Sequence, residues 1–197
     1  MIKTVFFDFG GIISGDNNSW DSMHKRIKTV TGLATEELDK IFLKHWEDIS
    51  TNKKSFTKFL EELVSTSKNN LTVDKLLELY REDTKINQEI VDIMKNLKKK
   101  GLRVALLSND SKLGETFRLK KVEQFVDTIY SSATLHLRKP NPEIFKHVLQ
   151  KENISPNEAL FIDDRERNIN AAQALGIKSI LYKNPKQLVE ELSEHLQ

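Results

Sequence analysis

The chain has 197 residues, 38% of them hydrophobic and 30% charged, which is enough for one sizeable core, with or without a small inserted domain. Its 31 basic and 29 acidic residues leave a net charge of +2, so there is no overall attraction to nucleic acid or to a membrane surface. No cysteine is present, no segment reaches membrane-spanning length, and the N-terminus lacks a signal-peptide layout, so we expect a cytoplasmic protein without disulfides.

The first strand is predicted at the N-terminus, where apolar and β-branched residues run from Thr4 to Phe7. A short run of this kind is typical of a fully buried strand. Asp8 follows it, and Gly10 and Gly11 come directly after, where glycine permits a sharp turn and a close approach of the backbone to a ligand. Asp8 is therefore expected at the carboxyl end of the strand, where open α/β sheets bind ligands, although a simple acidic turn residue fits the same place.

A block of predicted helices follows, with no strand candidate inside it. Thr35, Ser55 and Thr72 stand where helix N-caps are favoured. The aromatic residues at 42, 46, 56 and 59 recur at helical spacing and are interpreted as the core of this block. The predicted helices cover about 19–31, 35–49, 55–66 and 72–83. We interpret residues 15–84 as a helical insertion after the first strand.

Helices and strands then alternate strictly, which is typical of a parallel sheet with helices on both faces. Gly101 ends the first of these helices, and Asn141 and Pro142 occupy favoured cap and first-turn positions of a later one. The predicted strands cover 103–108, 126–131, 160–163 and 178–182, and the predicted helices cover 85–100, 112–121, 166–175 and 185–196, with one more beginning at Asn141. Residues 1–14 and 85–197 are therefore expected to form one α/β core domain.

Three predicted strands end in polar residues. The first ends at Asp8, the second at Ser108 and Asn109, and the fourth at Asp163 and Asp164. If these ends contribute to one site, the first strand lies between the second and the fourth, at the topological switch point where α/β sheets bind ligands. The expected fold is thus a Rossmann-like parallel sheet in the strand order 5-4-1-2-3.

These residue types suit phosphoryl transfer. Three carboxylates can hold Mg²⁺, which prefers oxygen ligands at ~2.1 Å, provided that they lie within roughly 8 Å of one another. Asp8 keeps an oxygen that can attack phosphorus and form an aspartyl-phosphate. Ser108 and neighbouring backbone N–H groups can bind phosphate oxygens, and Lys139 can neutralise charge. Taken singly, Ser108 could be a helix cap, Lys139 a solvated lysine, and Asp163 and Asp164 helix-start acids; their occurrence together favours a site.

The same segments resemble the motifs of the haloacid dehalogenase-like hydrolases. The matching segments are Phe7-Asp8-Phe9-Gly10-Gly11, Leu106-Leu107-Ser108-Asn109, Lys139-Pro140-Asn141-Pro142-Glu143-Ile144-Phe145, and Leu160-Phe161-Ile162-Asp163-Asp164 with Asn168. Ala171-Ala172 and Leu175-Gly176 continue the match. The resemblance covers the α/β part, and the helical insertion resembles the family's four-helix cap domain.

The resemblance implies a Mg²⁺-dependent phosphatase of a small phosphorylated metabolite, monomeric or homodimeric. It implies that Asp8 is the nucleophile, that Ser108 and Lys139 hold the phosphoryl group, and that Asp164 is the main acidic ligand of the metal. The expected site residues are Asp8, Ser108 and Lys139 for catalysis; Asn109, Gly11, Asp16, His24 and Lys54 for substrate binding, the last three from the cap; and Asp8, the Gly10 carbonyl, Asp164 and Asp163 for the metal, Asp163 as a ligand or a supporting acid.

One position departs from the family pattern. Most phosphatases of the family carry an aspartate two residues after the nucleophile, where this chain has Gly10. That aspartate protonates the leaving group and then activates water, and such catalysis is typically worth ~10²–10⁴-fold. The departure keeps open a non-catalytic phosphate-binding relative that acts through a partner. A 2-haloacid dehalogenase is the other alternative, but it needs no metal, and the Asp163–Asp164 pair argues against it.

Overall fold

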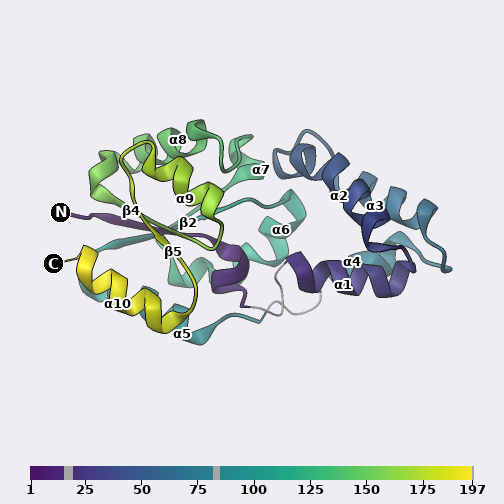
Figure 1. Cartoon of the computed structure of the whole chain (residues 1–197), viewed down its shortest axis with the longest axis horizontal. Coiled ribbons are helices and arrows are strands. Elements are labelled where there is room, and N and C mark those ends of the chain that lie inside the picture. Colours follow the sequence, from purple (N-terminus) through teal and green to yellow (C-terminus); the bar gives the residue numbers. More distant parts are fainter. Residues whose placement is uncertain (16–19, 82–84, 197) are drawn as a thin grey trace.

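The protein is described here by a computed structural model (Figure 1) that covers residues 1–15, 20–81 and 85–196, with residues 20–23 described by their backbone alone. One parallel five-stranded sheet has the order β3-β2-β1-β4-β5, which confirms the predicted order. The strands are β1 (Thr4–Phe7), β2 (Arg103–Ser108), β3 (Thr128–Ser131), β4 (Ala159–Asp163) and β5 (Lys178–Leu181). Because β1 pairs with β2 on one side and β4 on the other, Asp8 leaves the sheet between the ends of both neighbours.

Hydrophobic clusters cover both faces of the sheet. Along β1 the side chains alternate, so Val5 and Phe7 pack into one cluster and Phe6 into the other. The first cluster includes side chains of α5 (Gln88–Lys99) and α10 (Pro185–His195), and the second includes those of α8 (Pro142–Glu152) and α9 (Glu166–Gln173). The predicted α/β architecture is therefore confirmed, with helices on both sides of the sheet (Figure 1).

The helix predicted at 112–121 and the strand predicted at 126–131 are both shorter in the structure. The helix α6 (Lys112–Phe117) ends where the Arg118 side chain turns to pair with the buried carboxylate of Asp110, and a 3-10 helix (Leu119–Phe125) follows. At residue 127 the Asp127 carboxylate accepts the backbone N–H of Val104 at 2.9 Å, taking the place of a strand partner. Regular β pairing consequently begins only at residue 128.

Three further short elements in the described part of the chain were not predicted. They are a π-helical turn (Phe9–Ile13), the helix α7 (Ser132–Leu135) and a 3-10 turn (Pro156–Glu158). Each is too short to show a helical period in the sequence. The first of them matters for function because it carries the chain out of β1 and past Asp8.

The helices α1 (Trp20–Thr31), α2 (Thr35–Ser50), α3 (Phe56–Thr66) and α4 (Val73–Arg81) share a hydrophobic cluster of their own. They lie at the end of the molecule opposite to both termini, beyond the carboxyl ends of the strands (Figure 1). Ser55 and Thr72 accept backbone N–H groups at their helix starts as predicted, whereas the N-cap of α2 is Ala34 and Thr35 is its first helical residue. The domain boundaries at 14/15 and 84/85 stay a prediction.

Polar contacts join these helices to the rest of the described chain. His136 Nδ1 lies 2.8 Å from the carbonyl oxygen of Thr51, and the Tyr80 hydroxyl lies 3.1 Å from that of Ser111. The helical block is thereby held above the carboxyl edge of the sheet. Among the described helices, none combines the length and apolar character that crossing a membrane requires.

Candidate active site

Asp8 lies at the centre of the carboxyl edge of the sheet. Its backbone N–H donates to the Ile162 carbonyl at 2.9 Å, which continues the ladder between β1 and β4 by one residue. Its side chain is almost fully buried. The strand therefore fixes the direction in which the Asp8 carboxylate leaves the sheet.

The two glycines after Asp8 have different structural roles. Gly11 has a φ of +75°, and a Cβ there would lie 2.4 Å from Asp164 Oδ2, so only glycine lets this acid approach the turn. The Gly11 N–H donates to Ser14 Oγ at 3.3 Å. Gly10 has ordinary extended backbone angles, and a Cβ there would meet only Asp8 Oδ2 at 3.7 Å. The backbone thus requires glycine at position 11 and not at position 10.

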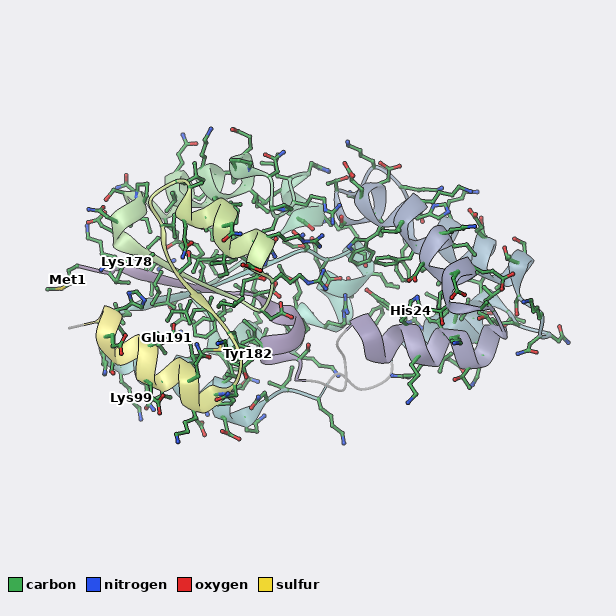
Figure 2. The ribbon with its side chains drawn as sticks, viewed as in Figure 1. Met1, His24, Lys99, Lys178, Tyr182 and Glu191 are labelled. Atoms are coloured by element: carbon green, nitrogen blue, oxygen red, sulfur yellow. The ribbon has the colours of Figure 1, made fainter. Side chains whose placement is uncertain are left out.

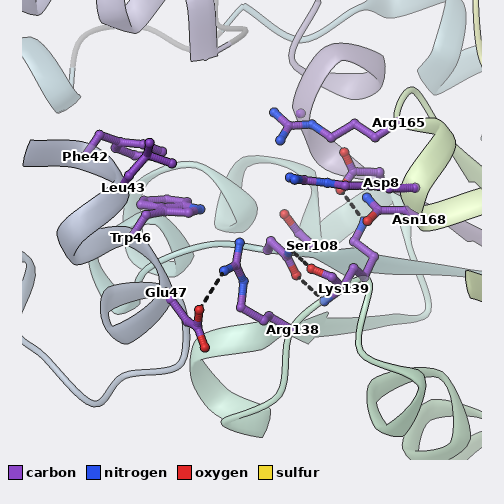
Figure 3. Close-up of a pocket in the computed structure, with 13 residues that line it drawn as sticks. Asp8, Phe42, Leu43, Trp46, Glu47, Ser108, Arg138, Lys139, Arg165 and Asn168 are labelled. Atoms are coloured by element: carbon purple, nitrogen blue, oxygen red, sulfur yellow. Dashed lines mark hydrogen bonds and ion pairs between the residues drawn. The ribbon is translucent and has the colours of Figure 1, made fainter. Parts of the chain in front are cut away.

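Asp8, Asp163 and Asp164 each offer a carboxylate oxygen, and these oxygens lie within 4.8 Å of one another. The spacing is well inside the limit of roughly 8 Å for sharing one Mg²⁺. Lys139 Nζ stands between two of the carboxylates, 2.7 Å from Asp8 Oδ1 and 2.7 Å from Asp163 Oδ2. Figure 3 shows the contact with Asp8. Three carboxylates thus face a single ammonium group.

Asp163 is more fully engaged than the other two acids. Asn168 Nδ2 donates to both of its oxygens at 2.9 Å, and the Arg165 backbone N–H donates to one of them at 2.9 Å. With Lys139 on the other oxygen, Asp163 orients the lysine and has little capacity left for a metal. This arrangement favours the supporting role among the two predicted for Asp163.

The crowding of negative charge around Lys139 shifts the pKa values of the neighbouring side chains. Burial raises the pKa of Asp8 to about 7; Lys139 opposes the shift, and the charges of Asp163 and Asp164 add to it. Burial and the neighbouring Asp163 likewise raise the pKa of Asp164. For Lys139, burial lowers the pKa, but attraction to Asp163 and Asp8 outweighs it and the net direction is upward. Excess negative charge among buried oxygen ligands is the environment that a divalent cation would stabilise.

Ser108 ends β2, Asn109 follows it, and both line the same cavity as Asp8. Asn109 Nδ2 donates to the Lys139 carbonyl at 2.8 Å, and Asn109 Oδ1 accepts the Lys139 N–H at 2.9 Å. The Asn109 side chain therefore positions the lysine backbone from across the sheet edge. Ser108 lies two residues beyond Leu106, the partner of Phe7 at the end of β1.

The cavity has a volume of about 300 Å³, and its second wall is α2. Figure 3 shows Phe42, Leu43 and Trp46 on one side and Asp8 and Asn168 on the other. The predicted cap residues His24 and Lys54 do not line it. His24, labelled on α1 in Figure 2, has Nε2 3.0 Å from Asp39 Oδ1, while Lys54 Nζ lies 2.6 Å from His45 Nδ1. Asp16 lies outside the described residues.

A model of the haloacid dehalogenase-like hydrolase family matches residues 2–176. The chain belongs to this family. The match spans the strand ends, the lysine segment and the inserted helices described above, and the resemblance noted from the sequence is confirmed.

Relatives within the family include two that align along nearly their whole length. D-ribitol-5-phosphate phosphatase of Bacteroides thetaiotaomicron is 27% identical over 98% of both chains. The crystal structure of a family enzyme from that organism, in complex with magnesium and inorganic phosphate, has a TM-score of 0.77 at 25% identity, covering 93% of this chain and 95% of that one. By contrast, this chain spans only 9% of mouse acyl-CoA dehydrogenase family member 10, to which it is 38% identical over 49% of its own length.

Several residues that line the cavity were not among the site residues predicted from the sequence. They are Phe42, Leu43, Trp46, Glu47, Arg138, Arg165, Arg167 and Asn168. Phe42 and Trp46 were interpreted as core, and they do pack against the helical cluster, but they also form the cavity wall. The available signal was the position of the three arginines, each within three residues of Lys139, Asp163 or Asp164 in the sequence.

Proposed function

We propose that this chain hydrolyses a phosphate monoester of a small metabolite through an aspartyl-phosphate on Asp8, with Mg²⁺ as cofactor. The observation that carries the proposal is the contact of Lys139 Nζ with Asp8 at 2.7 Å, inside a set of three carboxylates within 4.8 Å. The phosphatase among its relatives and the magnesium and phosphate held by its structural neighbour support the same chemistry.

The residues fit the metal by their donor chemistry. Asp8, Asp164 and the Gly10 carbonyl would hold Mg²⁺, with Asp163 supporting them through Lys139. Bound there, the ion supplies positive charge for the oxygens of the transferring phosphoryl group. The residues in place are hard oxygen donors, and the sequence has no cysteine that would favour a softer metal.

The first step is attack by Asp8 on phosphorus. Lys139 holds Oδ1 of Asp8, and Oδ2 forms the new bond to phosphorus while the ester oxygen departs with the bonding electrons. Ser108 donates its hydroxyl hydrogen to a phosphoryl oxygen, and the positive charge of Lys139 stabilises the negative charge that develops. Water then attacks the aspartyl-phosphate, which releases inorganic phosphate and restores the Asp8 carboxylate.

Gly10 limits which leaving groups depart easily. An alkoxide needs a proton as the ester bond breaks, and no carboxylic acid stands at position 10 to supply it. Among the described residues that line the cavity, the carboxylate other than Asp8 is Glu47, on the opposite wall. Acyl and aryl phosphates, whose leaving groups are weak bases, are therefore the favoured substrates.

The test is a screen of phosphorylated metabolites, together with aryl and acyl phosphates, in Mg²⁺ and in EDTA. We expect release of phosphate that EDTA abolishes and that Asp8→Asn reduces to background. Halide release from 2-haloacids in EDTA would instead indicate a dehalogenase. Binding of inorganic phosphate without turnover of any member of the panel would indicate the non-catalytic relative that Gly10 leaves open.

A further inference from the structure

Three of the seven arginines in the chain line the cavity above Asp8. They are Arg138, next to Lys139, and Arg165 and Arg167, at the start of α9. Lys139 Nζ contacts both Asp8 and Asp163. Among the described residues, none of the three guanidinium groups forms an ion pair with these carboxylates, although the charge of Arg165 lowers the pKa of Asp164.

These arginines have few anionic partners in the part of the chain that the structure describes. Arg138 Nη1 lies 3.9 Å from Glu47 Oε2, at the outer limit of an ion pair, and the buried Arg138 Nε has no hydrogen-bond partner. Neither Arg165 nor Arg167 forms an ion pair with a carboxylate of the described residues. An anion entering the cavity would therefore meet guanidinium donors for which Glu47 is the one competing carboxylate among the described residues.

The arginines also act on one another. Burial lowers the pKa of Arg138, Glu47 opposes this, and the charges of Arg167 and Arg165 lower the pKa further. Like charges held together around a cavity cost free energy that a bound anion recovers. Guanidinium groups suit carboxylate and phosphate because their planar donors bind two oxygens at once.

The opposite wall is apolar. The rings of Phe42 and Trp46 stack with centroids 4.9 Å apart, and Leu43 is 76% exposed beside them. Glu47, one position after Trp46, is 72% exposed in its side chain and faces Arg138. Figure 3 shows Phe42 and Trp46 on one side of the cavity and Arg165 on the side of Asp8, while Arg138 reaches towards Glu47 on α2.

We propose that the substrate carries, besides its phosphate ester, a second anionic group bound by Arg138, Arg165 and Arg167, joined to the phosphate by an apolar or planar segment that lies on Trp46. The proposal rests on the phosphatase function proposed above and narrows its substrate class. Glu47 is then an internal competitor: it occupies Arg138 when no substrate is present and yields it to the anion.

The test uses two substrates of the same shape, 4-carboxyphenyl phosphate and 4-carbamoylphenyl phosphate, which differ by one negative charge. The quantity measured is the ratio of their kcat/KM values. We expect the carboxylate to be preferred roughly tenfold, the scale of hydrogen bonds to a charged group. Arg167→Gln should bring the ratio towards one, and Glu47→Gln should raise it because the competing carboxylate is gone.

Arg81→Gln is the matched control. Arg81 lies on α4 over the Phe117 ring, away from the cavity, and the substitution removes the same charge. It should leave the ratio unchanged. Arg165 and Arg167 are exposed, so their substitution does not threaten the fold, and thermal unfolding verifies this. If Arg81→Gln lost the preference for the carboxylate as fully as Arg167→Gln does, the preference would reflect the net charge of the protein and not a site, and the proposal would be overturned.

A binding measurement separates this proposal from the phosphatase function. Isothermal titration of Asp8→Asn with each compound in Mg²⁺ should give tighter binding of the carboxylate, and the difference should vanish in Asp8→Asn combined with Arg167→Gln. That result supports the anion site even if the unsubstituted protein turns over neither compound, in which case the phosphatase function alone has failed. The second-anion proposal is overturned if a protein that keeps Arg167 turns over or binds the two compounds equally well. Equal turnover would leave the phosphatase function standing.

Discussion

The two walls of the cavity differ in how firmly their side chains are held. On the sheet side, Lys139 is 1% exposed and is fixed by two carboxylates through its ammonium group and by Asn109 through its backbone. On the α2 side, Leu43 and Glu47 are largely exposed, and among the described residues Glu47 makes one ion pair, at 3.9 Å from Arg138. The sheet side, where the proposed reacting groups lie, is thus the rigid wall of the cavity, and the α2 side is held by fewer contacts.

The largest expected effect is at the rigid wall, from Lys139→Ala. Removing the ammonium leaves Asp8 and Asp163 buried without their counter-ion, which costs ~3–5 kcal/mol in the free energy of unfolding, and phosphatase activity falls to background. Urea unfolding measures the first and phosphate release the second. Lys146→Ala, at an exposed pair with Glu143, should cost less than ~1 kcal/mol. Equal losses in the two variants would contradict the role given to the buried ammonium group of Lys139.

Gly10→Asp tests whether the rigid wall lacks one catalytic group. The new Cβ meets only Asp8 Oδ2 at 3.7 Å, so the fold accepts it. We expect a gain of ~10²-fold in kcat on an alkyl phosphate and a smaller one on an aryl phosphate, since only the alkoxide needs the proton. Gly10→Ala supplies the Cβ without the acid and should give no gain. Wild-type turnover of alkyl esters as fast as aryl esters would show that another acid already acts.

Removal of the metal should make stability depend on pH through Asp8. Its pKa is about 7 in the folded protein against 3.8 in the unfolded chain, so the folded state holds this proton more tightly. The stabilisation is full below about pH 4 and is lost as the pH rises through about 7. Adding Mg²⁺ at a hundred times its dissociation constant should restore ~2.7 kcal/mol at high pH and less at low pH, where protons compete. Thermal melts in EDTA and in Mg²⁺ at several pH values measure both effects, and a pH-independent gain would argue against a metal at Asp8.

Gly11→Ala sharpens the contrast between the two glycines. The φ of +75° and the 2.4 Å approach to Asp164 predict a cost of ~1–3 kcal/mol in stability, together with weaker Mg²⁺ binding as Asp164 moves away. Gly10→Ala, at ordinary backbone angles, should be neutral or slightly stabilising. Urea unfolding and a Mg²⁺ titration of both variants make the comparison. Similar results at the two positions would mean that Asp164 can move aside without loss.

The smallest effect is expected on the α2 side of the cavity, from Trp46→Ala. Losing the ring removes apolar contact with an aryl substrate, so KM for an aryl phosphate should rise severalfold, while kcat for a small acyl phosphate changes little. Steady-state kinetics on both substrates measure the two quantities. A large fall in kcat for the acyl phosphate would show that α2 takes part in the chemical step itself.

The positions of the proposed reactive groups in the fold could be predicted from the sequence because local patterns determine them. Asp8, Ser108, Asp163 and Asp164 each follow a short apolar run, and parallel strands bring such ends to one edge. The strand order followed from requiring those ends to meet. The need for glycine at position 11 was visible as a residue type, but its physical reason, the approach of Asp164, comes from the other side of the sheet.

Which side chains form the opposite wall, on α2, was decided by tertiary packing. His24 and Lys54 are polar residues in the inserted helices, yet they find partners there, Asp39 and His45, because neighbouring helices bring those side chains within reach. Phe42 and Trp46 share the helical period of buried residues, and a period does not distinguish a face covered by protein from one that borders a cavity. Which residues of α2 face Asp8 depends on how the helical block docks on the sheet, through contacts such as His136 with Thr51 that join residues far apart in the chain.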